Sequence, residues 1–313
     1  MSVLGDPGIS RLKLFMALSR TPHGVLDMAT PALAALLYLG TVPPLPVVLL
    51  GILTAFAGYT AVYALNDVVD HRVDREKVQH CGLPDAGGDL DAVCARHPIA
   101  QGLLSLREGI AWTVSWGAVA LVGAYLLNPT CALIFIVGCV AEAVYCLMLR
   151  VSYLRTLVSG VVKTAGGLAA IFAVAPAPSP LFVLVFFLWL FAWEIGGQNI
   201  PNDWADLKED QELRTDTIPV RFGVDVSLRI IVAALATAVL LSLVLYLVTP
   251  ARLSPAYLLG AIGAGGLLLL HPVQRLKARR DALSASALFN RSSVYPLALF
   301  VVVLASAILA RFG

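Results

Sequence analysis

Long runs of apolar residues, each bounded by a short polar or proline-containing segment, repeat along the whole chain. A transmembrane helix needs about 20 consecutive, mainly apolar residues to cross the hydrocarbon core of a bilayer, and by this criterion the runs predict about nine membrane-spanning helices. They lie near residues 22–40, 45–66, 109–127, 131–149, 157–175, 181–200, 227–248, 255–271 and 292–311.

Composition supports an all-α membrane protein. Of the 313 residues, 59% are hydrophobic and only 13% are charged. A soluble domain does not need so much apolar surface. We therefore expect a single integral-membrane domain over residues 1–313. The formal net charge is only +2. We expect the protein to lie in the lipid bilayer and not to bind nucleic acid.

The distribution of basic residues predicts the orientation of these helices. The connections at 41–46, 128–130 and 176–180 contain proline but no lysine or arginine, whereas the intervening connections and the N-terminal segment carry nearly all of the basic residues. Cytoplasmic loops of membrane proteins are enriched in Lys and Arg. The pattern therefore predicts a multi-pass protein of the cell membrane with its N-terminus in the cytoplasm. The longest loops, 67–108 and 201–226, are then also cytoplasmic.

These two long loops begin with the same arrangement of acids. Residues 66–74 and 202–210 both read N-D-x-x-D-x-x-x-D, and each copy follows a long apolar run. Acids three and four residues apart lie on one face of a helix. Facing carboxylates suit Mg²⁺, which is usually bound by a few carboxylates together with substrate phosphates. A pair of solvated acidic loops is the alternative, but the repeated spacing at membrane helix ends favours a functional site.

The same motif suggests an internal repeat. The two copies end the second and the sixth predicted spans, which is the spacing expected for a duplicated four-helix unit. Little similarity remains between the halves outside the copies, so any duplication is ancient.

Cationic residues near the acids are candidates for binding an anion. Arg72 lies inside the first copy, and Arg155, Ser159 and Lys163 follow one another at four-residue intervals at the start of the fifth span. At a rise of 1.5 Å per residue, Lys163 would lie about 12 Å deeper than Arg155. A lysine at that depth could face a polar cavity or a bound diphosphate. It could equally reach back toward the cytoplasm or pair with a buried acid such as Glu142.

Polar residues also precede the second copy. Glu194, Gln198 and Asn202 recur at four-residue spacing at the end of the sixth span. They could line a pocket, where they would orient a polar acceptor or take up a proton, or they could form hydrogen bonds between helices. Pro201 is predicted to break the helix just before the second copy, at a polar cavity.

The segment after the first copy contains His80, Cys81, Cys94 and His97, which are residue types that bind zinc. However, His80 is adjacent to Cys81, and twelve residues separate the two cysteines. This spacing disfavours a zinc site. A loop insertion rich in Gly and Asp is the better interpretation.

Taken in order, these motifs resemble the UbiA superfamily of intramembrane prenyltransferases. The resemblance rests on the first copy at 66–74, the segment P-I-A-Q-G at 98–102, the acids Asp206 and Asp210, and the segment T-I-P-V-R-F-G at 217–223. It implies a ring of nine helices around a central cavity, with a cytoplasmic cap. It also implies Mg²⁺-dependent transfer of a prenyl group from a polyprenyl diphosphate to an aromatic or other lipid-precursor acceptor.

The resemblance further implies that Asn66, Asp67, Asp70, Asp74, Asp206 and Asp210 hold Mg²⁺ and the diphosphate. The candidate catalytic residues are Asp67, Asp70, Asp206 and Asp210. The candidate metal ligands are Asp67, Asp70, Asp74, Asp203, Asp206 and Asp210. The candidate substrate-binding residues are Asn66, Arg72, Arg155, Lys163, Glu194, Gln198 and Asn202.

The chain also departs from the family pattern. His97 stands where the family usually has an arginine, with Arg96 one residue earlier. Arg214 and Asp216 replace the glycine and lysine usual in the second loop, and the loop over 75–97 is longer than usual. These departures leave the acceptor and the subfamily open.

The reaction expected is ionisation of an allylic C–O bond and alkylation of an acceptor by the carbocation, in a dry cavity that excludes water. Tyr63, Tyr145, Trp189 and Trp193 are candidate lining residues. A terpene cyclase of the same fold would ionise the same substrate without an acceptor. A cation or metabolite transporter is the alternative from another class, but transporter sites lie near the bilayer midplane and both acidic copies are predicted at one membrane face.

Overall fold

The computed structural model describes residues 10–80 and 95–311, and these residues form helices joined by turns and loops, with no strand among them. The chain begins with three short helices, α1 (Arg11–Leu18), α2 (Thr21–Asp27) and α3 (Ala29–Leu39). The elements that follow are α4 (Leu45–His80), α5 (Leu106–Leu127), α6 (Pro129–Leu147), α7 (Arg155–Val174), α8 (Pro180–Trp193), η2 (Glu194–Asn199), α9 (Ile200–Ala205), α10 (Leu207–Glu212), α11 (Ile218–Val248), α12 (Ala256–Gly265), η3 (Gly266–Leu270), α13 (His271–Arg279), α14 (Ala282–Ser293) and α15 (Tyr295–Leu309).

Eight helical segments of the described chain are long and apolar enough to cross a membrane. They correspond to the second through ninth predicted spans. The first predicted span, 22–40, consists instead of the short helices α2 and α3, which are separated at Met28. The α4 helix continues well beyond its predicted end at residue 66. It does so because residues 67–80 contain neither glycine nor proline, the residues that most readily end a helix.

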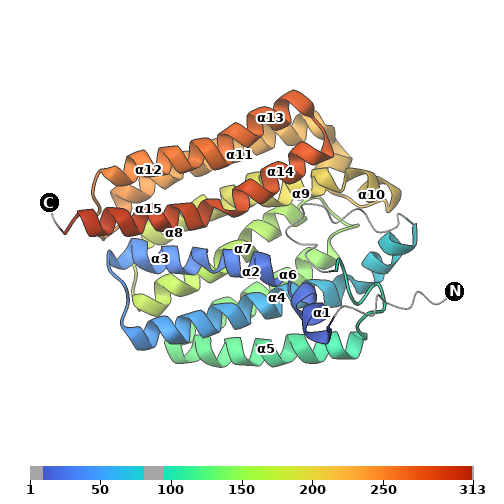
Figure 1. Ribbon diagram of the computed structural model, residues 1–313, viewed down its shortest axis with the longest axis horizontal. Helices are drawn as coiled ribbons and strands as arrows, with labels where there is room; N and C mark the ends of the chain where they lie inside the picture. The colour runs from blue at the N-terminus through green and yellow to red at the C-terminus, as the bar shows by residue number, and fades with distance from the viewer. Residues whose placement is uncertain (1–9, 81–94, 312–313) are drawn as a thin grey trace.

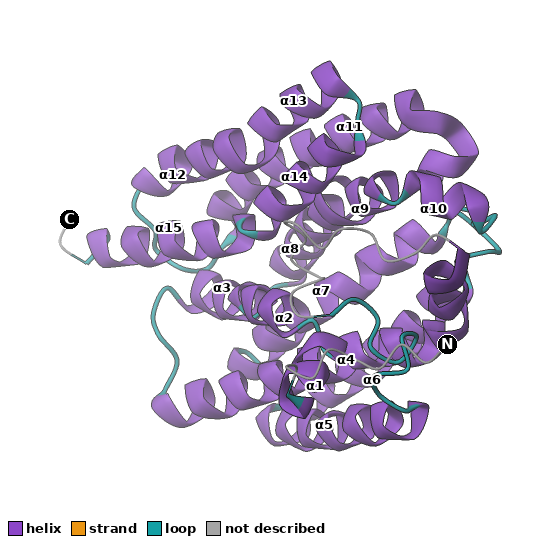
Figure 2. Cartoon of the chain, turned by 45° about the vertical axis from the view of Figure 1, so that its right-hand side comes forward, coloured by secondary structure: helices purple, strands orange, loops and turns teal. Residues whose placement is uncertain are grey.

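The long helices lie side by side along the longest dimension of the molecule (Figure 1). Helix α4 packs against α5 and α6, α7 packs against α3 and α6, and α8 packs against α11. Helix α15 packs against α3 and α12. Two views place α10 and the C-terminal turns of α4 at the same end of the bundle (Figures 1 and 2). Both copies of the acidic motif therefore lie at that end.

The main hydrophobic core is built around α8. This helix is apolar on all sides, a pattern typical of a membrane span, and it buries one face in the core while Leu181, Leu184 and Leu188 are exposed on the other. Phe182, Phe186, Trp189 and Trp193 are fully buried in it. Trp193 also donates a hydrogen bond from Nε1 to the carbonyl of Ser292 in α14, at 3.0 Å. The core thus fixes the position of α8, from which the second acidic copy continues.

Two π-helical segments interrupt the long helices, and each precedes a proline. Segment η2 is followed by Pro201, and η3 is followed by Pro272. Proline lacks a backbone N–H, and its ring clashes with the carbonyl four residues earlier. A widened π turn relieves that clash without ending the helix. The helix break predicted at Pro201 is therefore wrong, because the helix widens and continues to Ala205.

Candidate active site

A cavity of about 570 Å³ lies between the helices and follows one face of α4. Its lining changes along that helix, from small and apolar residues between Val47 and Gly58, through Tyr59 and Tyr63, to the acids of the first copy. At a rise of 1.5 Å per residue, this change extends over about 24 Å between Gly51 and Asp67. We refer below to the apolar end of the cavity, around residues 47–58 of α4, and to its acidic end, around residues 66–77.

Both copies of the motif contribute to the acidic end. The lining acids are Asp67, Asp70 and Asp74 of α4, Asp203 of α9, Asp206 between α9 and α10, and Asp210 of α10. Most of these carboxylates are buried. Buried carboxylates are strongly destabilising unless cations, protons or hydrogen-bond donors compensate them. The partners of each acid therefore decide what the site can bind.

His97 lies between two acids of the first copy. Its Nδ1 is 2.9 Å from Oδ2 of Asp74 and 3.4 Å from Oδ1 of Asp67. Burial of the imidazole opposes its protonation, but the two carboxylates outweigh burial and raise the pKa of His97 to about 9. One ligand atom from each of the three side chains lies within 4.8 Å of the others, so this group is also close enough to share a metal ion.

Asn66 is held between a cation and a buried acid. Arg20 donates a hydrogen bond from Nη2 to Oδ1 of Asn66 at 3.0 Å, and the same guanidinium lies 3.6 Å from Asp67. The amide nitrogen of Asn66 donates to Oε1 of Glu142 at 2.7 Å. Glu142, which the sequence predicted to be a buried acid, therefore fixes the orientation of the Asn66 amide.

The second copy is compensated by other cations. Arg155, a predicted site residue, is buried beside Asp203, with 3.3 Å between Nη1 and Oδ1, and its guanidinium lies 4.0 Å from the centre of the Tyr145 ring. Arg96 contacts Oδ2 of Asp206 at 2.8 Å. These contacts join the start of α7 and the loop before α5 to the second copy.

Lys77 connects the two copies. It extends from α4, one turn beyond Asp74, and its Nζ is 4.0 Å from Oδ1 of Asp210. Thr217 donates a hydrogen bond to the other oxygen of Asp210 at 3.3 Å. Burial raises the pKa of Asp210, and the charge of Lys77 partly opposes that rise. Because α4 reaches across to α10 in this way, the acids of the two copies face one shared space.

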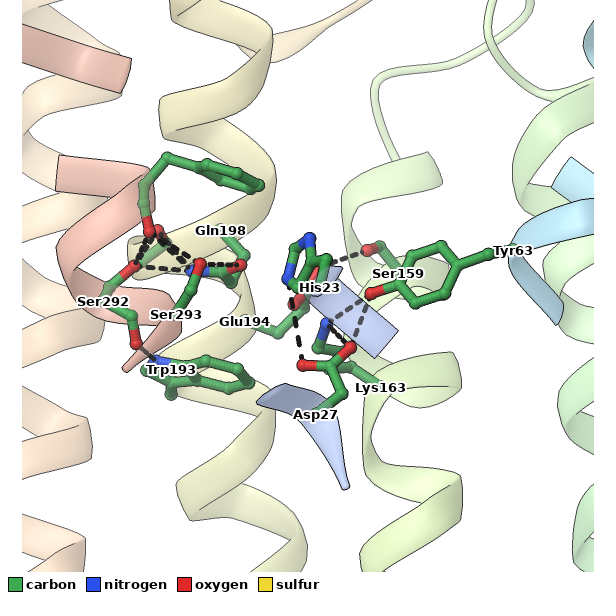
Figure 3. A network of polar contacts seen from close by, with 12 residues as sticks. His23, Asp27, Tyr63, Ser159, Lys163, Trp193, Glu194, Gln198, Ser292 and Ser293 are labelled. Carbon is green, nitrogen blue, oxygen red and sulfur yellow. Dashed lines mark hydrogen bonds and ion pairs between the residues drawn. The ribbon is translucent and has the colours of Figure 1, made fainter. Parts of the chain in front are cut away.

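Deeper in the cavity, Lys163 is paired with an acid that the sequence analysis did not name. Its Nζ is 2.6 Å from Oδ2 of Asp27 and 3.3 Å from the hydroxyl of Tyr63 (Figure 3). Tyr63 donates to the same carboxylate at 2.5 Å. Lys163 therefore faces a polar cavity, which was one of the alternatives. The suggested pairing with Glu142 is wrong, because the lysine pairs with Asp27 while Glu142 accepts a hydrogen bond from Asn66.

Glu194, Gln198 and Asn202 all line the cavity, but their contacts differ. Glu194 accepts a hydrogen bond from Ser159 at 2.6 Å. Gln198 donates to the hydroxyl of Ser292 at 2.6 Å and accepts from Ser293 at 3.2 Å, so it also joins two helices. Both alternatives of the sequence analysis are therefore found in this segment, since the three residues line a cavity and two of them also form hydrogen bonds to other helices.

Arg72 is the one predicted site residue that the structure does not bring to the cavity. It is exposed and does not belong to the cavity lining. Arg72 is two residues from both Asp70 and Asp74, and two residues correspond to a rotation of about 200° around an α-helix. Its side chain therefore lies on the opposite face of α4, and we leave it out of the site.

Two further predictions concern the cavity lining and zinc. Tyr63 and Tyr145 line the cavity as predicted, but Trp189 and Trp193 belong to the buried core instead, because they lie on the face of α8 that packs against other helices. Of the suggested zinc ligands, Cys81 and Cys94 lie outside the described residues, as does the side chain of His80. The side chain of His97 is described by the structure, and it contacts acids of the first copy.

Comparison with protein families identifies the chain. The model of the UbiA prenyltransferase family matches residues 28–294, which is most of the sequence. The chain belongs to the UbiA prenyltransferase family. It is therefore a multi-pass integral membrane protein and a transferase of prenyl groups. No curated protein matches this UbiA-family sequence significantly.

Solved structures support the same fold. An apo UbiA homolog from Aeropyrum pernix K1 is 20% identical, with a TM-score of 0.71, and the match covers 94% of this chain and 99% of that one. A structure described for digeranylgeranylglyceryl phosphate synthase is 17% identical, with a TM-score of 0.68 and coverages of 96% and 100%. A UbiA homolog from Archaeoglobus fulgidus bound to DMAPP and Mg²⁺ is 19% identical, with a TM-score of 0.64 and coverages of 92% and 98%.

The sequence analysis missed several cavity residues of this UbiA-family protein. They are Arg20, His23, Asp27, Lys77 and Arg96. A signal for two of them was present, since His23 and Asp27 are four residues apart in an otherwise apolar predicted span. Ionisable residues in such a span are usually functional. The other three lie in basic segments. Basic residues there also set the orientation in the membrane, so the sequence alone does not show which of them belong to the site.

Proposed function

We propose that the protein catalyses Mg²⁺-dependent transfer of a prenyl group from a polyprenyl diphosphate to an aromatic or lipid-precursor acceptor at the cytoplasmic face of the membrane. The observation that carries the proposal is the convergence of both acidic copies on one end of a cavity whose opposite end is apolar. A polyprenyl diphosphate has the same division, with a highly charged head and a long apolar chain. The homologs from Archaeoglobus fulgidus were solved with DMAPP or GPP together with Mg²⁺.

The donor set at the acidic end fits Mg²⁺. This ion prefers oxygen ligands and is commonly held by one or two carboxylates together with phosphate oxygens. Asp67, Asp70 and Asp74 from one side, and Asp203, Asp206 and Asp210 from the other, supply such oxygens. When bound, Mg²⁺ would neutralise charge on the diphosphate as the allylic bond breaks.

The cations of the site have complementary roles. Arg20 and Arg155 lie beside acids of the first and second copies, respectively, and both line the cavity. We propose that they bind the oxygens of the departing diphosphate, since guanidinium groups donate paired hydrogen bonds to phosphate. Asn66, oriented by Glu142, would contribute a further polar contact at the same place.

The apolar end is the proposed site of the prenyl chain. Its lining includes Gly51 and Gly58 of α4 and Ala165, Gly166 and Ala169 of α7. These small side chains leave room for a chain beside the helices. A Cβ atom added at Gly51 would meet no atom within 4 Å, so a larger residue there would enter open space rather than strain the fold.

We also propose that α2 and α3 together make one further crossing of the membrane, which would complete the nine-helix ring.

The acidic end would face the cytoplasm, because the loops at that end carry most of the basic residues. Cysteines introduced at Arg75 and Ala177, in a background without other cysteines, test this orientation. A membrane-impermeant maleimide should label the first only from the cytoplasmic side and the second only from outside. Labelling in the opposite sense would overturn the proposed orientation.

Purified protein in lipid nanodiscs, supplied with labelled geranyl or geranylgeranyl diphosphate, tests the reaction. We expect Mg²⁺-dependent binding of the diphosphate, release of pyrophosphate only when an acceptor is present, and loss of both binding and release when EDTA is added. Pyrophosphate release with a cyclic hydrocarbon product and no acceptor would identify a cyclase. Uptake of the intact diphosphate into sealed vesicles, without cleavage, would identify a transporter.

The role of the apolar end has its own test. Gly51→Phe should reduce transfer from geranylgeranyl diphosphate at least about tenfold more than transfer from dimethylallyl diphosphate, because only the longer chain reaches the blocked region. The matched control is Gly263→Phe, since Gly263 also has open space around its Cβ position but does not line the cavity. Equal losses with both substrates would place the chain elsewhere.

A further inference from the structure

A compact polar site lies between the acidic and apolar ends of the cavity. It consists of His23, Asp27, Tyr63, Lys163 and Glu194, which we call the inner polar site (Figure 3). All of its members line the cavity, and they come from α2, α4, α7 and η2. Three of these elements contribute ionisable groups, and α4 contributes the Tyr63 hydroxyl, at one depth in an apolar bundle. Such groups are costly there, and they are usually retained for function.

The inner polar site is directly below the acidic end. Tyr63 stands four residues, or about one helical turn, before Asp67 on α4. The centre of its ring is 5.8 Å from the guanidinium carbon of Arg20 and also 5.8 Å from Nζ of Lys163. Arg20 in turn contacts Asp67. A group bound at the inner polar site would therefore be next to the first carbons of a prenyl chain whose diphosphate is at the acidic end.

One buried atom of this site points to a ligand. Oε1 of Glu194 accepts a hydrogen bond from Ser159, whereas Oε2 is buried and has no hydrogen-bond partner among the described residues. Glu194 is only 6% exposed and lines the cavity. A buried carboxylate oxygen without a donor is destabilising by more than a typical hydrogen bond contributes. A ligand that donates an O–H group would remove that penalty.

The charges of the inner polar site select against anions. Its acids are Asp27 and Glu194, and the ammonium of Lys163 is 2.6 Å from Asp27. His23 is 3.8 Å from the same aspartate. A carboxylate or phosphate placed here would meet two acids and a lysine already neutralised by one of them. By contrast, a neutral hydroxyl group can donate to Glu194 without adding charge.

We propose that the inner polar site binds the hydroxyl group of a neutral acceptor, a phenol or an alcohol, and that Glu194 accepts its proton during transfer. This inference rests on the proposed prenyl-transfer function and specifies its acceptor. The acceptor carries no carboxylate near its reacting hydroxyl. Ser159 is a positioning residue, since its hydrogen bond holds the Glu194 carboxyl group toward the cavity.

The step is balanced with groups already present. The allylic C–O bond breaks, and its electron pair leaves with the diphosphate. An electron pair of the acceptor forms the new bond to the allylic carbon. The acceptor's proton passes to the carboxylate of Glu194, which then returns it to the released diphosphate. No oxidant, reductant or further reactant is needed.

Three small probes of similar size test the proposal with the wild-type protein. They are 4-methylphenol, 4-methylanisole, which lacks the O–H donor, and 4-hydroxybenzoate, which carries a carboxylate in place of the methyl group. Their dissociation constants are measured by ligand-observed NMR in nanodiscs saturated with geranyl S-thiolodiphosphate and Mg²⁺, with empty nanodiscs subtracted. We expect 4-methylphenol to bind at least tenfold more tightly than either of the other probes.

Two variants and a control locate this preference. Glu194→Gln should remove the advantage of 4-methylphenol over 4-methylanisole. Asp27→Asn should leave Lys163 without its closest carboxylate and therefore strengthen 4-hydroxybenzoate binding at least fivefold. Thr54→Val is the control, because Thr54 lines the cavity while its hydroxyl donates to its own helix at the carbonyl of Leu50. It should leave the order of the three probes unchanged.

Equal binding of 4-methylphenol and 4-methylanisole to the wild-type protein would overturn the proposal, and so would tighter binding of 4-hydroxybenzoate or no binding of 4-methylphenol. The wild-type comparison stands even if a variant fails to fold. Binding of the thiolodiphosphate is measured first, without probes. Its absence would refute the proposed function itself, whereas its presence without the probe preference would refute only the assignment of the acceptor.

Discussion

The two copies of the acidic motif have the same spacing of residues but different backbones. The first lies within α4, an unbroken helix of 36 residues. The second begins in α9, passes through Asp206 with φ −90° and ψ 9°, and continues in α10. It also follows a π-helical segment that has no counterpart before the first copy. Identical spacing therefore shows which residues belong to a site without showing how their side chains are directed.

The copies also differ in the partners of their acids. The first copy is contacted by Arg20 and by His97, which has both neighbouring carboxylates within 3.4 Å. The second is contacted by Arg96, Lys77 and the buried Arg155. A protonated imidazole is easier to displace or deprotonate than a guanidinium. We therefore expect the first copy to be the more readily available to a metal ion, and the second to depend more on the buried Arg155.

Replacing a metal-ligand candidate of the first copy should have the largest effect. Asp67→Asn and Asp70→Asn are expected to lower turnover about 100-fold or more, as expected for the loss of a group that stabilises developing charge. Release of labelled pyrophosphate at saturating Mg²⁺ is the measurement, with melting temperature as the check on folding. Near wild-type turnover in either variant would show that the first copy does not hold the metal.

Removing the buried arginine beside the second copy, Arg155, should affect folding as well as activity. Arg155→Met leaves Asp203 buried without its closest cation, and breaking a buried pair in this way typically destabilises by about 3 kcal/mol. The double variant Arg155→Met with Asp203→Asn should recover part of that loss. Thermal unfolding in detergent measures both. If the single and double variants melted at the same temperature, the unpaired charge of Asp203 would not be the cause of the lost stability.

Changing the proline next to the second copy should have the smallest effect. Pro201→Ala is expected to change the free energy of unfolding by no more than about 1 kcal/mol, since the π turn already accommodates the proline ring. Turnover should stay within about threefold of wild type, because the core contacts of Trp193 and Gln198 hold η2 in place independently. A loss of turnover tenfold or greater would show that Pro201 itself maintains the π turn.

The sequence was sufficient for features that depend on local pattern. Apolar runs of about 20 residues predicted the second through ninth spans, because burial of such runs in lipid depends little on their neighbours. The acids of both copies were also found by spacing, and all of them line the cavity. The prediction for Arg72 could have been corrected from helical periodicity alone. Arg72 lies two residues from Asp70 and from Asp74, so it must point away from the face that those two acids share.

Features that depend on contacts between distant segments could not be predicted. Arg20, Lys77 and Arg96 contact acids of the site from separate parts of the chain. A polar cavity was one of the alternatives left open for Lys163, and its partner Asp27 is 136 residues away in the sequence. The π turn before Pro201 was also missed, since a proline in a helix can end, kink or widen it, and only the surrounding packing selects among these outcomes.

The π-helical segments also affect how this chain tolerates changes in length. A π turn contains one residue more than the α turn it replaces, so each segment acts as a one-residue insertion absorbed within a helix. Deleting one residue from η2 should therefore convert the π turn into an α turn and keep the direction of the helix beyond it, whereas the same deletion within α8 would rotate everything beyond it by about 100°. The second acidic copy would then turn away from the first. The register of the helix, and not only the identity of its acids, thus determines whether the two halves of the site meet.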